Sequence, residues 1–260
     1  MEKRELENIA KLLNEARLNA RPITQLSKQN LALTRTEAYQ VQEAGLKLRE
    51  SLGEKRVGLK MGLTSEGKRK QMNLDSPLYG ELTEQMHVGA EGFSLASHIH
   101  SKIEPEIAFM IKDELAGTVT REQVLNATSA VCACLEILDS RYEQFKYFSM
   151  EDVIADNSSS SHFVTGPWLK DFRNIDLREL KMKMSVNGTL VHEALSHEIS
   201  GDPVVSVIEL CALLEKRGRK LPAGSIVLAG AATAAVALEA GTTVSLSVDQ
   251  LPALSVEIKP

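Results

Sequence analysis

The chain has 260 residues, of which 43% are hydrophobic and 25% are charged, and its net charge is −5. This length allows one large domain or two small ones, and the negative charge gives no electrostatic case for binding nucleic acid. No apolar run approaches the roughly 20 residues of a membrane span. Its three cysteines do not suggest a disulfide framework. We therefore expect a cytoplasmic protein that works without a membrane or nucleic-acid partner.

The first 50 residues are predicted to be helical. Apolar side chains recur there with the spacing of one helix face, at Leu6, Ile9, Leu13 and Ala16. The segment "TRTE" at 34–37 has the form of a capping box, so a second helix is expected to begin there.

From residue 56 onward the pattern becomes that of strands. The segments "RVGLKMGL", "KIEPEIAFMIK" and "CLEILDS" are each predicted as a strand, and "TREQ" at 120–123 marks a short helix between the last two. The glycines of the first segment are interpreted as letting the backbone approach a ligand. The basic clusters at 67–70 and 215–220 are short, and each is interpreted as a solvated turn.

The last hundred residues combine a hairpin, one helix and further strands. Asn187-Gly188 favours a type I′ turn within the hairpin. The helix that follows is predicted to have Asp202 as its N-cap, Pro203 as its first residue and Gly218 beyond its end. Many strands with few helices between them favour an α+β protein over a doubly wound sheet.

Several segments resemble catalytic or binding motifs but lack a residue that the motif requires. Gly67-Lys68 is followed by Arg69 where a phosphate-binding loop needs Ser or Thr. His98 and His100 are interpreted as a loop or strand-edge pair, and the serines at 158–161 have no legible His-Asp partners. Cys132 and Cys134 are interpreted as buried thiols, because no second cysteine pair is present to complete a zinc site.

The strand "KIEPEIAFMI" raises a specific question about charge. With a period of two, Glu104 and Glu106 project from one face, roughly 7 Å apart at Cα. A third acid, Glu136, interrupts another apolar stretch. Neighbouring carboxylates repel, and burial raises the cost, so a basic side chain, shared protons or a divalent cation must compensate. If the strand instead lies at a solvent-facing edge, no compensation is needed.

Five segments carry a resemblance to a known family. They occur in order as "GLKMGLTS", "KIEPEIAF", "LEILDSRYEQFKY", "VIADNSSSSHFVTG" and "AGAATAAVALEAGT". Together they resemble the fumarylacetoacetate hydrolase superfamily, in its branch of hydratases and decarboxylases, over residues 5–258. The resemblance implies a single catalytic domain over residues 1–260, a mixed β-roll with a helical part at 1–50. It also implies one Mg²⁺ or Mn²⁺ ion held by Glu104, Glu106 and Glu136.

The same resemblance suggests a choice between two reactions. "SPLYG" at 76–80 places Leu78 where hydratases of this type have an acid/base Asp, and "DSRYEQF" at 139–145 and "TAAV" at 233–236 follow the decarboxylase pattern. Decarboxylation of 2-oxo-3-hexenedioate to 2-hydroxypenta-2,4-dienoate and CO₂ is therefore expected. The hydratase of 2-hydroxypenta-2,4-dienoate is the alternative. A C–C hydrolase would need a His-Glu pair that is not evident, and an intact set of acids argues against a non-catalytic partner subunit.

The remaining site residues are implied by the resemblance. Lys60, Ser159 and Arg141 are predicted to be catalytic, with Arg141 orienting Glu136 or binding a distal carboxylate. Thr233 and Leu78 are predicted to bind substrate. A homo-oligomer and a complex with the hydratase of the same pathway are also expected. Family members often have Gly-Gly before the "TAAV" segment, where this chain has Gly230-Ala231-Ala232, which bears on the shape of that loop and on substrate fit.

Overall fold

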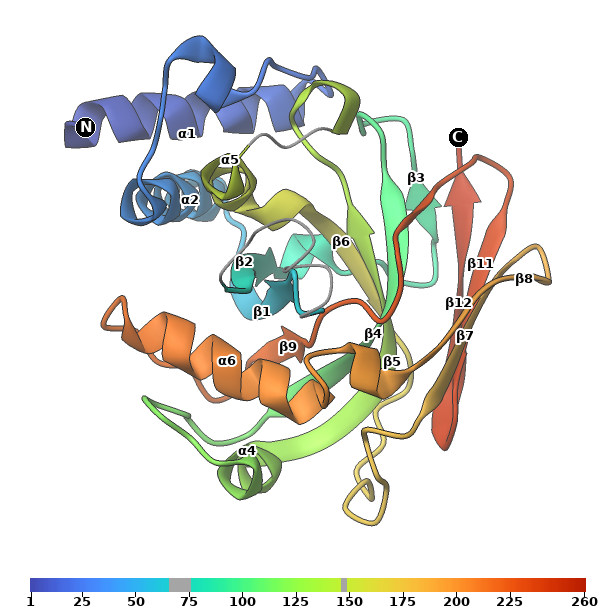
Figure 1. Ribbon diagram of the computed structural model, residues 1–260. Coiled ribbons are helices and arrows are strands. Elements are labelled where there is room, and N and C mark those ends of the chain that lie inside the picture. Colours follow the sequence, from blue (N-terminus) through green and yellow to red (C-terminus); the bar gives the residue numbers. More distant parts are fainter. Residues whose placement is uncertain (66–75, 146–148) are drawn as a thin grey trace.

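Two β-sheets and a set of helices make up the protein, as the computed structural model shows (Figure 1). The structure describes residues 1–65, 76–145 and 149–260. The basic cluster at 67–70, which includes Gly67-Lys68, lies outside the described residues. None of the helices in the described ranges is long and apolar enough to cross a membrane.

Helices α1 (Lys3–Leu18) and α2 (Arg35–Ser51) form the N-terminal part, as predicted. The predicted face of α1 is buried, and the Thr34 side chain accepts a hydrogen bond from the Glu37 backbone N–H at the start of α2. The buried Gln42 amide of α2 donates to two backbone carbonyls in the rest of the molecule. These contacts fix the helical part against the sheets. A 3-10 turn, η1 (Leu26–Gln29), lies between the two helices.

The first sheet carries most of the sequence-predicted site. Its strand order is β2-β1-β9-β4-β5-β6, with β10 paired to β4. Strand β1 runs parallel to β9, and the other pairs are antiparallel. The bounds are β1 Arg56–Gly62, β2 Leu78–Thr83, β4 Lys102–Ile111, β5 Thr128–Leu138, β6 Ser160–Thr165, β9 Ile226–Leu228 and β10 Val236–Ala237.

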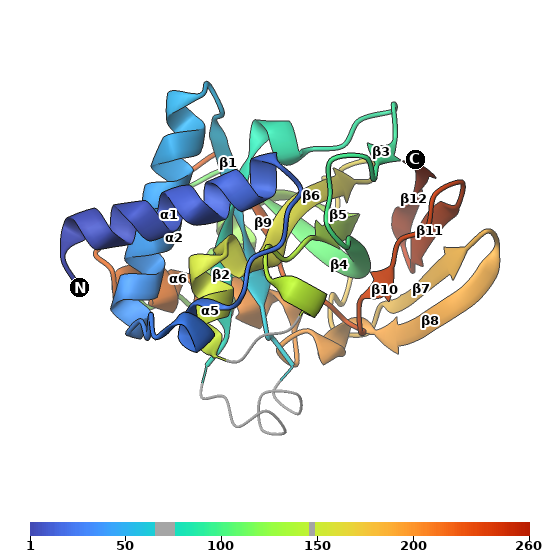
Figure 2. The ribbon, with the colours of Figure 1, turned by 90° about the horizontal axis from the view of Figure 1, so that it is seen from above.

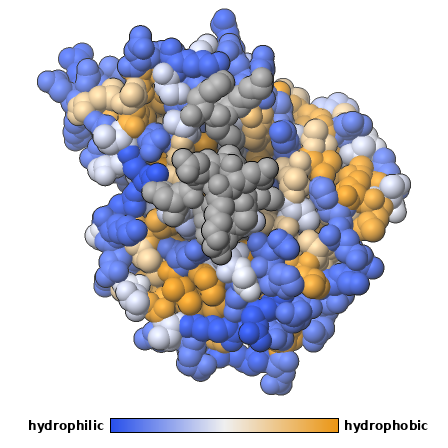
Figure 3. Space-filling model, viewed as in Figure 1, coloured by the Kyte–Doolittle hydropathy of each residue, from blue (hydrophilic) through white to orange (hydrophobic). Residues whose placement is uncertain are grey.

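The second sheet packs against the first and contains the predicted hairpin. Its order is β3-β12-β11-β7-β8, and Asn187 and Gly188 both have positive φ between β7 and β8, as a type I′ turn requires. Leu190 and Val191 on β8 are exposed, and apolar surface gathers on that side of the molecule (Figure 3). The bounds are β3 Phe93–Ser94, β7 Lys181–Val186, β8 Thr189–Leu195, β11 Thr243–Val248 and β12 Leu251–Lys259.

Three more helices lie in the described ranges, and Figure 2 shows α1 and α2 crossing on the side of the first sheet remote from β7 and β8. Asp202 caps α6 by accepting from the Val204 backbone N–H, and Gly218 beyond the helix has φ +64°, as predicted. The predicted α+β class is confirmed. The bounds are α4 Arg121–Ala127, α5 Met150–Ala155, α6 Pro203–Glu215, η2 Glu84–Met86, η3 Glu143–Phe145, η4 Asn157–Ser159 and η5 Ser196–Glu198.

The second basic cluster, at 215–220, is not simply a solvated turn, so that interpretation is wrong in part. The Arg217 guanidinium stacks on the Tyr39 ring, 3.5 Å from its centroid. Arg219 donates to the buried carboxylate of Glu81 on β2. The end of α6 is thereby joined to α2 and to the first sheet through two arginines.

The glycines of β1 also act differently from the prediction, because they make room for protein groups. A Cβ on Gly58 would lie 1.9 Å from the backbone oxygen of Ile226 on β9, and one on Gly62 would lie 2.7 Å from Leu78 Cδ1. Gly58 therefore permits the close pairing of β1 with β9. That pairing sets the position of Lys60, two residues farther along β1.

We predict that Gly58→Ala destabilises the protein by about 2 kcal/mol or more, because the added methyl group forces β1 and β9 apart. Gly45→Ala is the matched control, since nothing lies within 4 Å of a Cβ at that helical position. It should raise stability by up to about 1 kcal/mol through helix propensity. Denaturant unfolding of both variants checks this. Equal effects of the two substitutions would refute the close-approach explanation.

A candidate metal centre

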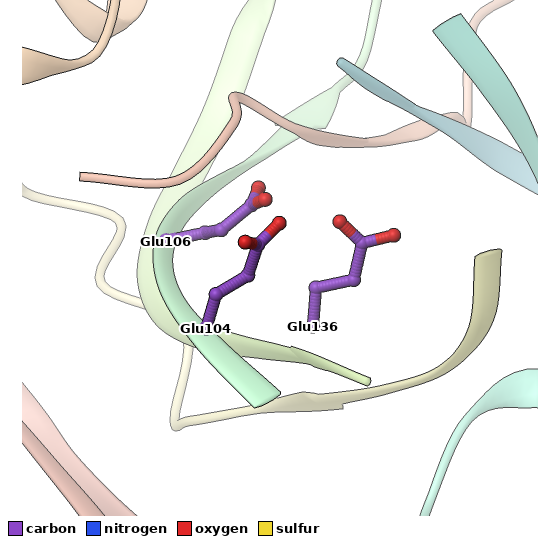
Figure 4. A group of neighbouring side chains, drawn as sticks. All are labelled: Glu104, Glu106 and Glu136. Atoms are coloured by element: carbon purple, nitrogen blue, oxygen red, sulfur yellow. The ribbon is translucent and has the colours of Figure 1, made fainter. Parts of the chain in front are cut away.

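Strands β4 and β5 bring three carboxylates together. Glu104 lies directly opposite Glu136 in the antiparallel register, and Glu106 is two residues farther along the same face of β4. One ligand oxygen from each lies within 4.8 Å of the others. Their carboxylates converge on a common space (Figure 4). Glu106 and Glu136 are fully buried and Glu104 is partly buried, so the cluster is not at a solvent-facing edge.

Glu106 is fully buried and has one carboxylate oxygen without a donor among the described residues. The Gly230 backbone N–H donates to its Oε2 over 2.7 Å, while its buried Oε1 has no hydrogen-bond partner in the described part of the chain. Burial, followed by the charges of Glu136 and Glu104, raises the pKa of Glu106 well above the ordinary value of a glutamate. A buried acceptor without a donor is costly, so this oxygen favours a cation as its partner.

Lys60 supplies one compensating charge from across the curved sheet. Its Nζ lies 3.1 Å from Glu136 Oε1, and both side chains are buried. Gly80 is the cross-strand partner of Lys60, and a Cβ there would lie 3.3 Å from Lys60 Cε. The lysine stem therefore occupies space that a side chain at position 80 would fill. Within the described residues, Lys60 thus compensates the charge of Glu136 directly.

The serine segment reaches the cluster through Ser160, which the sequence did not single out. Ser160 Oγ donates to Glu136 Oε1 over 3.3 Å. The predicted Ser159 is the buried neighbour of Ser160, and its carbonyl accepts from the Asp139 backbone N–H. Asn157, Ser158 and Ser159 all have positive φ, which turns the chain sharply into β6. Four consecutive serines gave no signal for which hydroxyl the turn would direct inward.

Arg141 is buried and holds that turn in place. Its guanidinium bonds the Asp156 carboxylate and the Asp156 carbonyl, and also donates to the Ser160 carbonyl over 3.2 Å. Burial raises the pKa of Asp156 to about 6 despite this pairing. The guanidinium contacts neither Glu136 nor another member of the carboxylate cluster through these bonds. Its influence on Glu136 passes through Ser160, so the structure gives Arg141 a positioning part.

The two predicted substrate-binding residues lie around the cluster. Leu78 is the first residue of β2 and pairs with Gly62. A Cβ built on Gly62 would lie 2.7 Å from Leu78 Cδ1 and 3.8 Å from Lys60 Nζ, so both side chains approach this position. Thr233 follows Gly230 in the loop that runs beside β4, where the Ala232 backbone N–H donates to the Pro105 carbonyl. Their contact with substrate stays a prediction.

The donor set fits a hard divalent cation. Mg²⁺ and Mn²⁺ favour carboxylate oxygens and keep positions for water or substrate oxygens, and the free Oε1 of Glu106 is such a donor. Glu104, Glu106 and Glu136 would hold the ion. In the described part of the chain they are the one group of three or more His, Cys, Asp or Glu side chains within ligating range, so Cys132, Cys134 and the histidines do not form a second one.

We predict that Glu106→Gln weakens Mg²⁺ binding at least about tenfold and abolishes activity. The Gly230 N–H selects the amide oxygen, so the amide nitrogen, which cannot ligate a cation, faces the cluster. Calorimetric titration with Mg²⁺ checks the affinity. Wild-type affinity in this variant would remove Glu106 from the ligand set.

The same substitution tests the electrostatics without metal. Because the folded-state pKa of Glu106 lies above its ordinary value of 4.5, ionisation of Glu106 costs stability as pH rises above that value. Metal-free Glu106→Gln should therefore melt at a higher temperature than metal-free wild type at pH 7.5. The difference should shrink toward pH 4.5. A difference that grows as pH falls would contradict the assigned shift.

We predict that Lys60→Met lowers kcat/KM more than tenfold, the loss expected for one charge-assisted hydrogen bond of about 1.5–3 kcal/mol. Mg²⁺ affinity should not fall, because the variant removes a positive charge from beside Glu136. Lys47→Met, at an exposed position on α2, is the control. If both variants show normal kinetics, Lys60 has no part in the reaction.

Comparisons with known proteins agree with this geometry. The family model "Fumarylacetoacetate (FAA) hydrolase C-terminal" matches residues 62–259. A 4-oxalocrotonate decarboxylase from Pseudomonas sp is 41% identical over 96% of this chain and 96% of its own length. A 2-hydroxyhexa-2,4-dienoate hydratase from Comamonas testosteroni is 34% identical over 98% of each.

A solved structure is similar over nearly the whole length. The 4-oxalocrotonate decarboxylase from Pseudomonas putida G7, complexed with magnesium and adipate, superposes with a TM-score of 0.94 at 33% identity. The match covers 99% of this chain and 98% of that one. From its fold, its matched segment and these relatives, this chain belongs to the fumarylacetoacetate hydrolase family.

Proposed function

We propose that this chain is a metal-dependent decarboxylase that converts 2-oxo-3-hexenedioate to 2-hydroxypenta-2,4-dienoate and CO₂, a step of aromatic meta-cleavage catabolism. The observation that carries the proposal is a buried cluster of three carboxylates bordered by Lys60 and by Leu78, an apolar residue where the related hydratases have an acid. The similarity to 4-oxalocrotonate decarboxylases over 96% of the chain supports it.

The reaction moves one electron pair along the substrate. The bond between C5 and the C6 carboxylate breaks, CO₂ leaves, and the pair passes through the C3–C4 double bond to the oxygen on C2. A bound Mg²⁺ would supply Lewis-acid stabilisation of the negative charge at that oxygen, worth several kcal/mol of barrier. We propose that an ion held by Glu104, Glu106 and Glu136 would act at the 2-oxo acid end of the substrate.

Lys60 has the chemistry to assist at the developing enolate. Its ammonium has three donors, and the structure pairs it with Glu136 alone among the described carboxylates. When substrate is bound, one of these donors is available to the C2 oxygen or to the C1 carboxylate. Burial strengthens such a charge-assisted bond relative to the same bond in water.

Leu78 accounts for the absence of hydration. Adding water to a double bond needs a general base positioned by its surroundings, and the buried Leu78 side chain cannot take a proton. Loss of CO₂ needs no base, and an apolar wall favours a neutral leaving molecule over a carboxylate. We propose that Ser159, the neighbour of Ser160, and Thr233, in the loop after Gly230, act at the substrate and not at the metal.

The location, oligomeric state and partner of the protein are proposed from the sequence alone. We propose a cytoplasmic enzyme that forms a homo-oligomer and associates with the hydratase that consumes its product. Such an association would keep an unstable dienol from free solution.

We predict that the wild type releases CO₂ from 2-oxo-3-hexenedioate with Mg²⁺ and hydrates 2-hydroxypenta-2,4-dienoate poorly. Leu78→Asp should cut decarboxylation by over 100-fold. A carboxylate about 4–5 Å from the departing one repels it by roughly 3–4 kcal/mol at an effective dielectric near 20. It also competes with Glu136 for Lys60, since Leu78 and Lys60 approach one another across Gly62.

Leu78→Asn is the matched control, because it has nearly the same shape as Asp without the charge. It should lose less activity than Leu78→Asp at pH 7.5. Both proteins and the wild type are assayed for CO₂ release and for hydration. Efficient hydration without CO₂ release by the wild type would show that the protein is the hydratase instead.

A further inference from the structure

Lys102 lies on the same face of β4 as two of the three carboxylates. The register of β4 against β5 is regular from position 102 to position 110, so residues 102, 104 and 106 project together. Lys102 pairs with Leu138, and Glu104 pairs with Glu136, one step nearer the centre of the sheet. The lysine is only partly exposed. It is therefore the next side chain along the ligand face, toward the start of the strand.

The surroundings of Lys102 lack the usual partner of a half-buried lysine. No carboxylate of the described chain lies within 4.0 Å of its Nζ, which instead rests 4.3 Å from the centroid of the Phe145 ring. The His100 ring lies on the same phenylalanine, with centroids 5.2 Å apart. The His100 Nε2 is buried and has no hydrogen-bond partner among the described residues. Among the described residues, the Lys102 ammonium thus lies on an aromatic ring without an acidic partner.

The position also matches the shape of the substrate. Alternate residues of a strand are about 6.6–6.8 Å apart. A six-carbon chain with bonds of about 1.5 Å spans roughly 6 Å between its terminal carboxyl carbons. If the 2-oxo acid end lies at the glutamate cluster and the chain runs along β4 toward the start of the strand, the other end would reach the level of Lys102. A lysine is suited to hold that carboxylate, because its ammonium is a compact charge on a flexible stem.

We propose that Lys102, supported by Phe145, binds the distal carboxylate of the substrate and selects dicarboxylates over monocarboxylates. This inference rests on the proposed function. It also assigns that carboxylate to a residue other than Arg141, whose guanidinium is engaged with Asp156 and the backbone.

The reaction imposes a kinetic signature on such a residue. The charge of the distal carboxylate moves toward the C2 oxygen as CO₂ departs, so Lys102 holds the ground state more strongly than the transition state. Lys102→Met should raise KM for 2-oxo-3-hexenedioate about tenfold or more without lowering kcat by a similar factor. A residue needed only for the fold would lower both activity and melting temperature.

The direct test is a pair of unreactive analogues. 2-Oxoadipate and 2-oxohexanoate share the 2-oxo acid end and differ in the distal carboxylate, and calorimetry with excess Mg²⁺ measures the affinity of each. Wild type should prefer 2-oxoadipate about tenfold or more, and Lys102→Met should lose that preference while binding 2-oxohexanoate as before. Lys112→Met, an exposed lysine just beyond β4, is the control and should keep the preference.

Two results would overturn the proposal, and both differ from failure of the proposed function. One is an unchanged preference for 2-oxoadipate in Lys102→Met. The other is an equal loss of affinity for both analogues, which would mean that Lys102 acts on the metal centre or the fold. Failure of the proposed function appears separately, as a wild type that releases no CO₂ from 2-oxo-3-hexenedioate. The analogue titration does not depend on turnover.

Discussion

The site in this structure depends on how the repulsion among three neighbouring carboxylates is compensated. Glu104, Glu106 and Glu136 converge within 4.8 Å, and two of them have no access to water. Placing like charges at this distance in a medium of low dielectric costs several kcal/mol unless a counter-charge is present. Lys60 offsets part of that cost, while burial and the charges of Glu136 and Glu104 raise the pKa of Glu106 well above its ordinary value. A divalent cation held by these carboxylates would neutralise more of this charge.

The rest of the molecule holds this arrangement in place. Strand β1 brings Lys60 from across the curved sheet, and the close approach of Gly58 to β9 fixes the position of that strand. The loop after β9 delivers the Gly230 N–H to Glu106, while the turn clamped by Arg141 delivers Ser160 to Glu136. Supporting contacts thus reach the two buried glutamates from separate parts of the chain. Because the glutamates are held in place, we propose that substrate specificity is set by residues around the substrate, among them Leu78 and Lys102.

Local patterns in the sequence predicted much of this fold, because the causes were local. Caps at Thr34 and Asp202 and the Asn187-Gly188 turn depend on a few adjacent residues, and the glutamate pair followed from strand periodicity. The contacts that local patterns did not predict join segments that are far apart in the sequence. Gly58 meets β9, Arg217 meets Tyr39, and Ser160 reaches Glu136 only after three residues of positive φ turn the chain. The spacing of residues within one segment does not predict such pairings.

The measurement that tests the central claim most directly is the proton balance of Mg²⁺ binding to the metal-free wild type. Calorimetric titrations in buffers of different ionisation enthalpy give the number of protons released per ion bound. One ion should bind, raise the melting temperature, and release a proton at pH values below the raised pKa of Glu106, with the release vanishing at higher pH. Absence of Mg²⁺ binding, or binding with no proton release at any pH, would contradict the account that a cation compensates this buried carboxylate cluster.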